Sequence, residues 1–394
     1  MGAWQPGDPP GQRQYASLFQ RQPLRLEGGE PFGPITLAYE SWGQPNRERS
    51  NGVLLLHGFS GDSHAAGPRE PGHPTAGWWH QLIGSGRPID TDRFWVICPN
   101  VFGGCQGSSG PSSLAADGQA YGLGFPRITI RDQVACELAL ADHLAIGRWH
   151  GGIGGSMGGM RALEWALLAP GRVPRLGLLA TAAAASPQQE LWHQLELQAL
   201  AWRAAGQPGL EISGTGPASA ASPVRLEGLA LARSIALVSY GAPNGLSPLD
   251  DLGVGRLGMA SGHLPIGPFS HRQLGDLAHG LVGLSHQHQE LVDFLGRFDA
   301  HSYRALCGAM TRHDLGRDRG GVAAALARIQ ARTEILSIRS DRLFPADLQQ
   351  AIAAQIRSPV RLVTIDSRHG HDGFLLEEEL IGPWLRHVLE GSDA

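Results

Sequence analysis

Short apolar runs alternate along the first half of this chain with segments whose apolar positions have helical spacing. Residues 35–42 (ITLAYESW) alternate well enough to predict an early strand. Three later runs are almost wholly apolar, which is typical of strands that helices cover on both faces. They are Val53–Leu56, Phe94–Cys98 and Leu176–Leu179. The first 30 residues are expected to form a loose arm with one short strand near Leu24–Leu26.

The segment Thr129–Ala145 carries the clearest helix signals. Thr129 and Asp132 make a plausible capping box, apolar residues then recur at helical spacing, and Gly147 ends the pattern. Strands and helices that alternate at this spacing predict a mostly parallel sheet, because each connection crosses over through a helix.

The alternation stops near residue 186. Helical patterns separated by Gly/Pro/Ser-rich tracts follow, over Leu191–Arg203, Leu226–Tyr240, Gln273–Leu295 and Ser302–Met310. The sheet then resumes with Glu334–Ile338, a helix over Pro345–Ile356, the strand Arg361–Ile365 and a last helix over Glu377–Leu389. We therefore predict a core in two parts, residues 1–187 and 330–394, with a helical lid insertion at 188–329.

The segment Gly151–Met160 (GGIGGSMGGM) contains a G-x-S-x-G pattern centred on Ser156. The residues before it, Arg148–His150, can enter a sheet, and those after it predict a helix, which is the context of a nucleophile elbow. In a chain with 55 glycines the pattern can also arise by chance. A dinucleotide-binding G-x-G-x-x-G is excluded because Met157 replaces its last glycine, and a P-loop because the chain has no lysine.

A serine nucleophile needs an adjacent base, itself oriented by a carboxylate. In α/β-hydrolases these residues follow in the order Ser, Asp/Glu, His, on loops after late strands. Asp341 ends one such strand, although it could instead cap the helix that starts near Pro345. His369 and His371 both follow the last predicted strand, and their position alone does not choose between them.

The oxyanion hole of this fold uses two backbone N–H groups. One belongs to the residue after the nucleophile, Met157, and the other to the loop after an early strand, where Phe59 is the candidate. Nucleophile, acid–base pair and oxyanion loop occur in the right order, which favours an α/β-hydrolase fold with Ser156 as nucleophile.

Charge, apolar runs and cysteine spacing argue against several classes of function. The net charge of −4, with 36 acidic against 32 basic residues, gives no reason to expect nucleic-acid binding. The N-terminus lacks the features of a signal peptide, and no apolar run approaches the roughly 20 residues that span a bilayer. The four cysteines show no metal-ligand spacing, so we expect reduced thiols in a cytoplasmic protein without a bound metal.

Motifs from about Ile35 to about Leu389 extend the pattern well beyond the elbow. They include ITLAYESWG, LHGFSGDSHAAG, FPRITIRDQV, GGSMGGMRALEW, RFDAHSY, HDLGRDRGG, SDRLFP and GHDGFL. Together they resemble the homoserine O-acyltransferases of the α/β-hydrolase fold. A general esterase would share the elbow and little else. The chain departs from the family where HGFSG replaces HALTG beside the oxyanion hole, and over residues 241–290.

The resemblance assigns roles position by position. Ser156 matches the nucleophile, Asp341 in SDRLFP the acid, and His371 in GHDGFL the base in preference to His369. Three further residues match positions that bind the acceptor: Asp372 holds its ammonium, Arg233 grips its carboxylate, and Tyr240 lines the same pocket.

The activity that the resemblance implies is transfer of acetyl from acetyl-CoA to L-homoserine through an acyl-serine, in methionine biosynthesis. It also implies a homodimer and no cofactor apart from the co-substrate acetyl-CoA. Transfer of succinyl, or use of serine as acceptor, stays open within the family. A serine esterase and a non-catalytic scaffold are the alternatives outside it.

Overall fold

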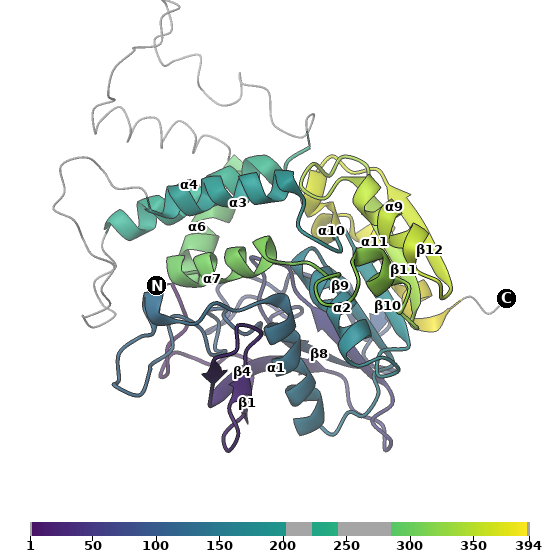
Figure 1. Ribbon diagram of the computed structural model, residues 1–394, viewed down its shortest axis with the longest axis horizontal. Helices are drawn as coiled ribbons and strands as arrows, with labels where there is room; N and C mark the ends of the chain where they lie inside the picture. Colours follow the sequence, from purple (N-terminus) through teal and green to yellow (C-terminus); the bar gives the residue numbers. More distant parts are fainter. Residues whose placement is uncertain (1, 202–222, 243–284, 392–394) are drawn as a thin grey trace, which may run out of the picture.

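An eight-stranded sheet forms the centre of the computed structural model, which describes residues 2–201, 223–242 and 285–391 (Figure 1). Its strands are ordered β1-β4-β8-β5-β9-β10-β11-β12. From β8 onward neighbouring strands are parallel, whereas β4 pairs antiparallel with β1 and β8. The bounds are β1 Gln14–Leu18, β4 Ile35–Trp42, β8 Trp95–Pro99, β5 Gly52–Leu56, β9 Gly151–Gly155, β10 Arg175–Leu179, β11 Arg332–Ile338 and β12 Val360–Ile365. The prediction of a mostly parallel sheet is confirmed.

The N-terminal segment differs from its prediction. Instead of a loose arm, residues Gln14–Leu18 form β1 and pair with β4 at the edge of the main sheet. Ala16 and Leu18 point into the core, but a five-residue strand with two inward side chains is too short a pattern to recognise. The expected short strand is present as β2, Leu24–Arg25, paired with β3, Pro31–Phe32. A second small pair joins β6, Ile83–Gly84, to β7, Ile89–Asp90.

Helices cover both faces of the sheet. The predicted capping box of α1, Ile130–His143, is present, with Thr129 and Asp132 bonding each other's backbone N–H groups. The other helices around the sheet are α2 Met157–Leu168, α8 Val322–Leu326, α9 Ala346–Gln355, α10 Gly373–Leu376 and α11 Glu378–Glu390, with the short 3₁₀ turns η1 Gly122–Gly124 and η4 Gly370–Asp372.

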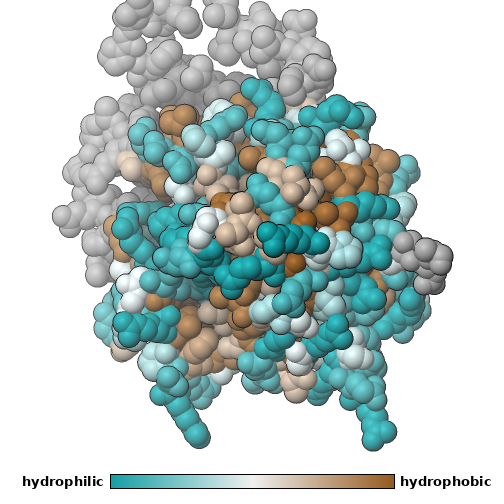
Figure 2. All heavy atoms as spheres, turned by 45° about the vertical axis from the view of Figure 1, so that its right-hand side comes forward, coloured by the Kyte–Doolittle hydropathy of each residue, from teal (hydrophilic) through white to brown (hydrophobic). Residues whose placement is uncertain are grey.

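The buried strands divide the core into two layers. Leu54 and Leu56 of β5 point into the cluster that includes residues of α1 and α2. Val53 and Leu55 point into a second cluster that includes α11. Burying both faces explains why this strand is apolar at every position, as expected for a parallel strand inside an α/β fold. On the face shown in Figure 2, brown apolar surface is interrupted by teal polar side chains.

Among the described residues, four further helices lie above the sheet in the view of Figure 1. They are α3 Pro187–Ala201, α4 Pro223–Tyr240, α6 Ser285–Arg297 and α7 Ala300–Thr311. Helix α4 packs on α3, α6 and α7, and it also contacts η4. Of the predicted helix Gln273–Leu295, the part before Ser285 lies outside the described residues, as do most of residues 241–290. Within the described residues, no helix is long and apolar enough to cross a membrane.

Candidate active site

Ser156 sits at the sharp turn between β9 and α2. Its backbone has φ 56° and ψ −125°, a conformation that L-residues seldom adopt and that marks local strain. A Cβ on Gly154 would lie 2.2 Å from the Gly158 carbonyl oxygen, and one on Gly158 would lie 2.0 Å from the carbonyl oxygen of Leu56. Only glycine permits this close approach of strand and helix, so the two outer residues of the G-x-S-x-G pattern are required by packing.

The strand of the elbow is not the one predicted. It is built from Gly151–Gly155 themselves, and Arg148–His150 precede it. Glycine has a low intrinsic propensity for strands. In β9 the close contacts with neighbouring residues decide the sequence instead. A Cβ on Gly155 would lie 2.7 Å from the ring of Phe374, and one on Gly152 would lie 3.0 Å from Val173.

A continuous hydrogen-bond chain links the serine to a histidine and a carboxylate. Ser156 Oγ lies 2.9 Å from His371 Nε2, and His371 Nδ1 lies 2.7 Å from Asp341 Oδ2. All three residues are buried. These are the contacts that a histidine needs to take a proton from a serine while a carboxylate holds its tautomer. His369 is not part of this hydrogen-bond chain, because its own hydrogen bonds are to Arg368 and Ser367.

The carboxylate of Asp341 is fixed from both sides. Its Oδ1 accepts hydrogen bonds from the backbone N–H groups of Leu343, at 2.9 Å, and Phe344, at 2.8 Å. The helix α9 begins after Pro345 without any side-chain cap. Asp341 therefore orders the turn ahead of α9 with one oxygen and His371 with the other, and it is not the cap of that helix.

The surroundings of His371 favour its charged form despite burial. Burial alone lowers its pKa, whereas the charge and hydrogen bond of Asp341, and the nearby Asp372, raise it, and the net result is a pKa above the ordinary 6.5. The rings of Phe344 and Phe374 pack against the imidazole, with centroids 5.0 Å and 5.3 Å away. A base that gains stability on protonation is what proton removal from a serine requires.

The loop after β5 lies directly beside the nucleophile. A Cβ on Gly58 would lie 3.7 Å from Ser156 Cβ. The ring of the next residue, Phe59, packs edge-on against Tyr303 of α7 at 4.7 Å. Met157 is the first residue of α2, so its N–H has no carbonyl partner within the helix. Gly58, which precedes the predicted oxyanion-hole residue Phe59, thus lies against Ser156, and the other predicted residue, Met157, follows Ser156 directly.

His57 fixes the start of this loop. Its Nδ1 lies 2.7 Å from the Gly58 carbonyl, and its Nε2 accepts a hydrogen bond from the Val101 N–H at 3.1 Å. Burial, helped by the charge of Arg161, lowers the pKa of His57 to about 3, so the ring is neutral and can donate at one nitrogen while accepting at the other.

Arg233 and Tyr240, on helix α4, approach the same catalytic histidine, His371, from the group of helices α3, α4, α6 and α7. The Arg233 guanidinium lies over the rings of Tyr240, at 5.3 Å, and Phe294, at 4.8 Å. The Tyr240 ring in turn lies 5.4 Å from that of His371. Arg233 is only 3% exposed, and its Nη2 donates to Glu290 Oε1 of α6 at 2.6 Å. Its Nε and Nη1 have no hydrogen-bond partner among the described residues.

Asp372 follows the candidate base directly and is half-buried. Its pKa is raised to about 6, first by burial and then by the charge of Glu290, while His371 and Arg233 act in the opposite direction. A buried arginine whose Nε and Nη1 have no partner among the described residues, with a carboxylate nearby, can receive a ligand that carries both charges.

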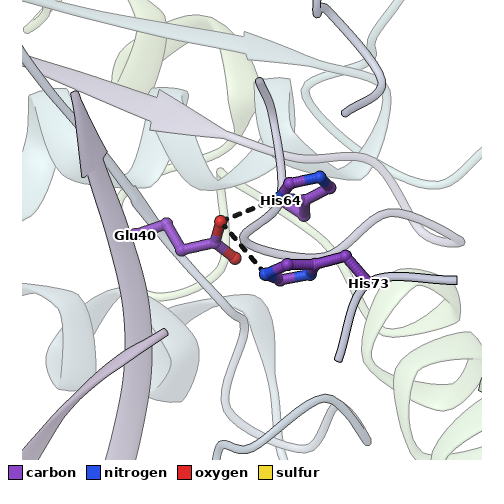
Figure 3. A group of neighbouring side chains, drawn as sticks. All are labelled: Glu40, His64 and His73. Carbon is purple, nitrogen blue, oxygen red and sulfur yellow. Dashed lines mark hydrogen bonds and ion pairs between the residues drawn. The ribbon is translucent and has the colours of Figure 1, made fainter. Parts of the chain in front are cut away.

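Glu40, His64 and His73 form a buried group whose ligand atoms lie within 4.8 Å of one another, as a metal site would require (Figure 3). The polar atoms are already paired: His64 Nδ1 meets Glu40 Oε2 at 2.9 Å, and His73 Nε2 accepts from the Gln12 N–H at 3.1 Å. The two rings stack at 3.7 Å and 8°. An ion would have to lie in both ring planes, and near-parallel planes do not converge on one. The group is therefore better described as a buried ion pair of Glu40 with His64, whose pKa is raised despite its burial because of Glu40.

Sequence reasoning missed three residues of this site. Phe344 and Phe374 pack on the imidazole, and both stand within the quoted motifs SDRLFP and GHDGFL, so the motifs could have indicated them. Glu290 lies in the stretch that matches the family poorly, where the sequence offered no signal. Its contact with Arg233 joins residues 57 positions apart.

Comparison with known proteins concerns the fold and the family of this chain. A family model described as alpha/beta hydrolase fold matches residues 51–223. A Thermobifida fusca (strain YX) protein named homoserine O-acetyltransferase is 44% identical over 398 residues, covering 98% of this chain and 96% of that protein.

Two solved structures share the fold. Esterase E22 superposes with a TM-score of 0.77 at 25% identity, covering 96% of this chain and 99% of the esterase. The homoserine O-acetyltransferase from Bacillus anthracis superposes with a TM-score of 0.76 at 23% identity, covering 97% of this chain and 98% of that one. From its identity to the T. fusca protein over nearly the whole of both chains, this chain belongs to the homoserine O-acetyltransferase family of the α/β-hydrolase fold.

Proposed function

We propose that this protein transfers the acetyl group of acetyl-CoA to the side-chain hydroxyl of L-homoserine through an acetyl-Ser156 intermediate. One observation carries the proposal: the chain of contacts from Ser156 through His371 to Asp341 lies beside a buried, incompletely paired Arg233 and a carboxylate, Asp372. The first set of groups suits acyl transfer, and the second suits an amino-acid acceptor.

In the first half-reaction, His371 Nε2 takes the proton of Ser156 Oγ as the oxygen attacks the thioester carbonyl. The N–H groups of Phe59 and Met157 are the proposed donors to the tetrahedral oxyanion, and one such donor typically contributes about 10²–10³-fold to the rate. The C–S bond then breaks, His371 returns its proton to the thiolate, and CoA leaves as the thiol. Throughout, Asp341 stabilises the imidazolium at 2.7 Å.

The second half-reaction repeats the same steps with a new nucleophile. His371 removes the proton of the homoserine hydroxyl, whose oxygen attacks the acetyl-Ser156 carbonyl. Collapse of the intermediate breaks the bond to Ser156 Oγ, which recovers its proton from His371. Arg233 would hold the acceptor carboxylate through its free Nε and Nη1, and Asp372 would hold the ammonium.

Transfer succeeds over hydrolysis only where water is kept from the acyl-serine. We propose that residues 188–329 form a lid over the site, inserted in the sequence between the two parts of the core, residues 1–187 and 330–394. Support comes from α4, which contacts η4, the turn that carries His371. We further propose that the reaction uses no cofactor besides acetyl-CoA and takes place in the cytoplasm.

A homodimer is also proposed. The observation behind it is a set of apolar side chains that stay exposed on α3 and α4. Leu191 and Leu195 of α3 are 61% and 48% exposed, and Val238 of α4 is 54% exposed. Because α3 and α4 pack on each other, exposed apolar side chains on both helices support an interface there.

The test is a matrix of donors and acceptors with purified protein. Acetyl-CoA and succinyl-CoA are each combined with homoserine, serine and water, and CoA release and acylated product are both measured. Acetyl-CoA with homoserine should give the highest kcat/KM. Fast CoA release in water with little acylated amino acid would instead favour an esterase, the second candidate, which the similarity to esterase E22 keeps in view.

A further inference from the structure

The site proposed for the acceptor includes an acidic residue that the proposed mechanism does not use. Glu290 of α6 lies 2.6 Å from Arg233 Nη2, and its side chain remains 35% exposed. It therefore neutralises the only group that the mechanism assigns to the acceptor carboxylate. Glu290 by itself weakens the attraction of Arg233 for an anion. The negative charges of Glu290 and of the acceptor carboxylate would lie on neighbouring edges of one guanidinium and repel each other.

Glu290 also influences Asp372, the residue proposed to hold the ammonium of the acceptor. Asp372 is faced by Glu290 from α6, by Arg233 from α4, by His371 from its own turn and by Asp341 from the loop after β11. Of these neighbours, Glu290 has the largest effect on the pKa of Asp372 and raises it. Glu290 and Asp372 therefore share one electrostatic environment, in which a cation is favoured.

We propose that Glu290 makes the pocket selective for a zwitterionic acceptor and against a hydroxy acid that carries a carboxylate alone. This inference rests on the proposed function. With Arg233 positive and Glu290 and Asp372 negative, an acceptor anion without an ammonium adds to an existing excess of negative charge. A zwitterion adds none, because its ammonium faces the two carboxylates while its carboxylate meets the free nitrogens of Arg233.

The direct test compares two acceptors that differ only in the amino group: L-homoserine and 4-hydroxybutyrate. The variant Glu290→Gln keeps an oxygen that can accept from Arg233 and loses the charge. Glu290→Asp keeps the charge and shows whether a loss of activity comes from disturbed packing. Glu390→Gln is the matched control. Glu390 lies in α11, also pairs with an arginine, Arg93, and has a similar side-chain exposure of 39%. The CoA burst with acetyl-CoA alone gives the concentration of working sites for each variant.

In wild-type protein, kcat/KM for homoserine should greatly exceed that for 4-hydroxybutyrate. In Glu290→Gln this ratio should fall about tenfold or more, the effect of a contact worth about 1.4 kcal/mol, and part of the change should be a gain with 4-hydroxybutyrate. Glu290→Asp and Glu390→Gln should keep the wild-type ratio.

An unchanged ratio in Glu290→Gln, with transfer to homoserine intact, would overturn the inference. So would an equal loss with both acceptors, since that is the mark of a residue that only positions Arg233. Failure of the proposed function has a different signature: wild-type protein would then transfer to neither acceptor, whatever stands at position 290.

Discussion

Replacing Asp341 with asparagine should convert His371 into the wrong tautomer. In the native site, Asp341 Oδ1 accepts from the N–H groups of Leu343 and Phe344, at 2.9 and 2.8 Å, while Oδ2 meets His371 Nδ1 at 2.7 Å. An asparagine has a single oxygen. That oxygen must face the two N–H groups, because an amide NH₂ there would place donor against donor. The NH₂ then faces Nδ1, which has to accept, so the proton of the imidazole moves to Nε2.

An imidazole protonated at Nε2 cannot accept the proton of Ser156, which lies 2.9 Å away. The same substitution in a serine-protease triad lowers kcat about 10⁴-fold, which corresponds to about 5.4 kcal/mol of lost transition-state stabilisation. We expect a loss of this order in both half-reactions. A second effect concerns pH: Asp341 raises the pKa of His371, so the acid limb of any residual activity should lie at lower pH than the acid limb of the wild type.

Stopped-flow release of CoA from acetyl-CoA alone measures the first half-reaction for this variant. Asp366→Asn is the matched control, because Asp366 follows β12, is 79% exposed and bonds the exposed Arg339. The control should release CoA at the wild-type rate. If Asp341→Asn released CoA within about tenfold of wild type with an unchanged acid limb, the tautomer argument would be refuted and Asp341 would be only a structural residue.

Three more outcomes are expected. Ser156→Ala should fold normally by circular dichroism yet lose transfer by on the order of 10³-fold or more, with no CoA burst; near-wild-type turnover would remove Ser156 from the mechanism. Arg233→Ala should retain the burst but lose kcat/KM for homoserine by about 10²-fold, because a substrate carboxylate is left unpaired; loss of the burst as well would mean that Arg233 supports the triad. Glu196→Gln should raise the free energy of unfolding at pH 8 and have much less effect at pH 4, as measured by denaturant titration at both values. Burial raises the pKa of Glu196 from 4.5 to about 7, so the folded state favours the protonated carboxyl, and ionisation at pH 8 costs about 3 kcal/mol. Equal effects at the two pH values would contradict that reasoning.

Most of the sheet and of the hydrogen-bonded chain at Ser156 could be predicted from the sequence, because both depend on local patterns. Val53–Leu56 reads as a buried strand from its composition, and Thr129 with Asp132 reads as a capping box from its spacing. Asp341 and His371 follow predictable strands, and parallel strands bring their carboxyl ends to one edge of the sheet. The choice of His371 over His369 came from the family resemblance, and the contact with Ser156 agrees with it.

Tertiary packing decided the features that local patterns could not reveal. The glycines of β9 have low strand propensity, and they form a strand by pairing with β5 and β10. Glycine is required there because Gly158, Phe374 and Val173 leave no room for side chains. The pairing of β1 with β4 turned an apparently loose arm into a sheet edge. The contact between Arg233 and Glu290 spans 57 positions across two separate helices. The sequence around each residue shows no motif or periodicity that would predict this contact. It depends on how α4 and α6 pack against each other, a property of the whole fold.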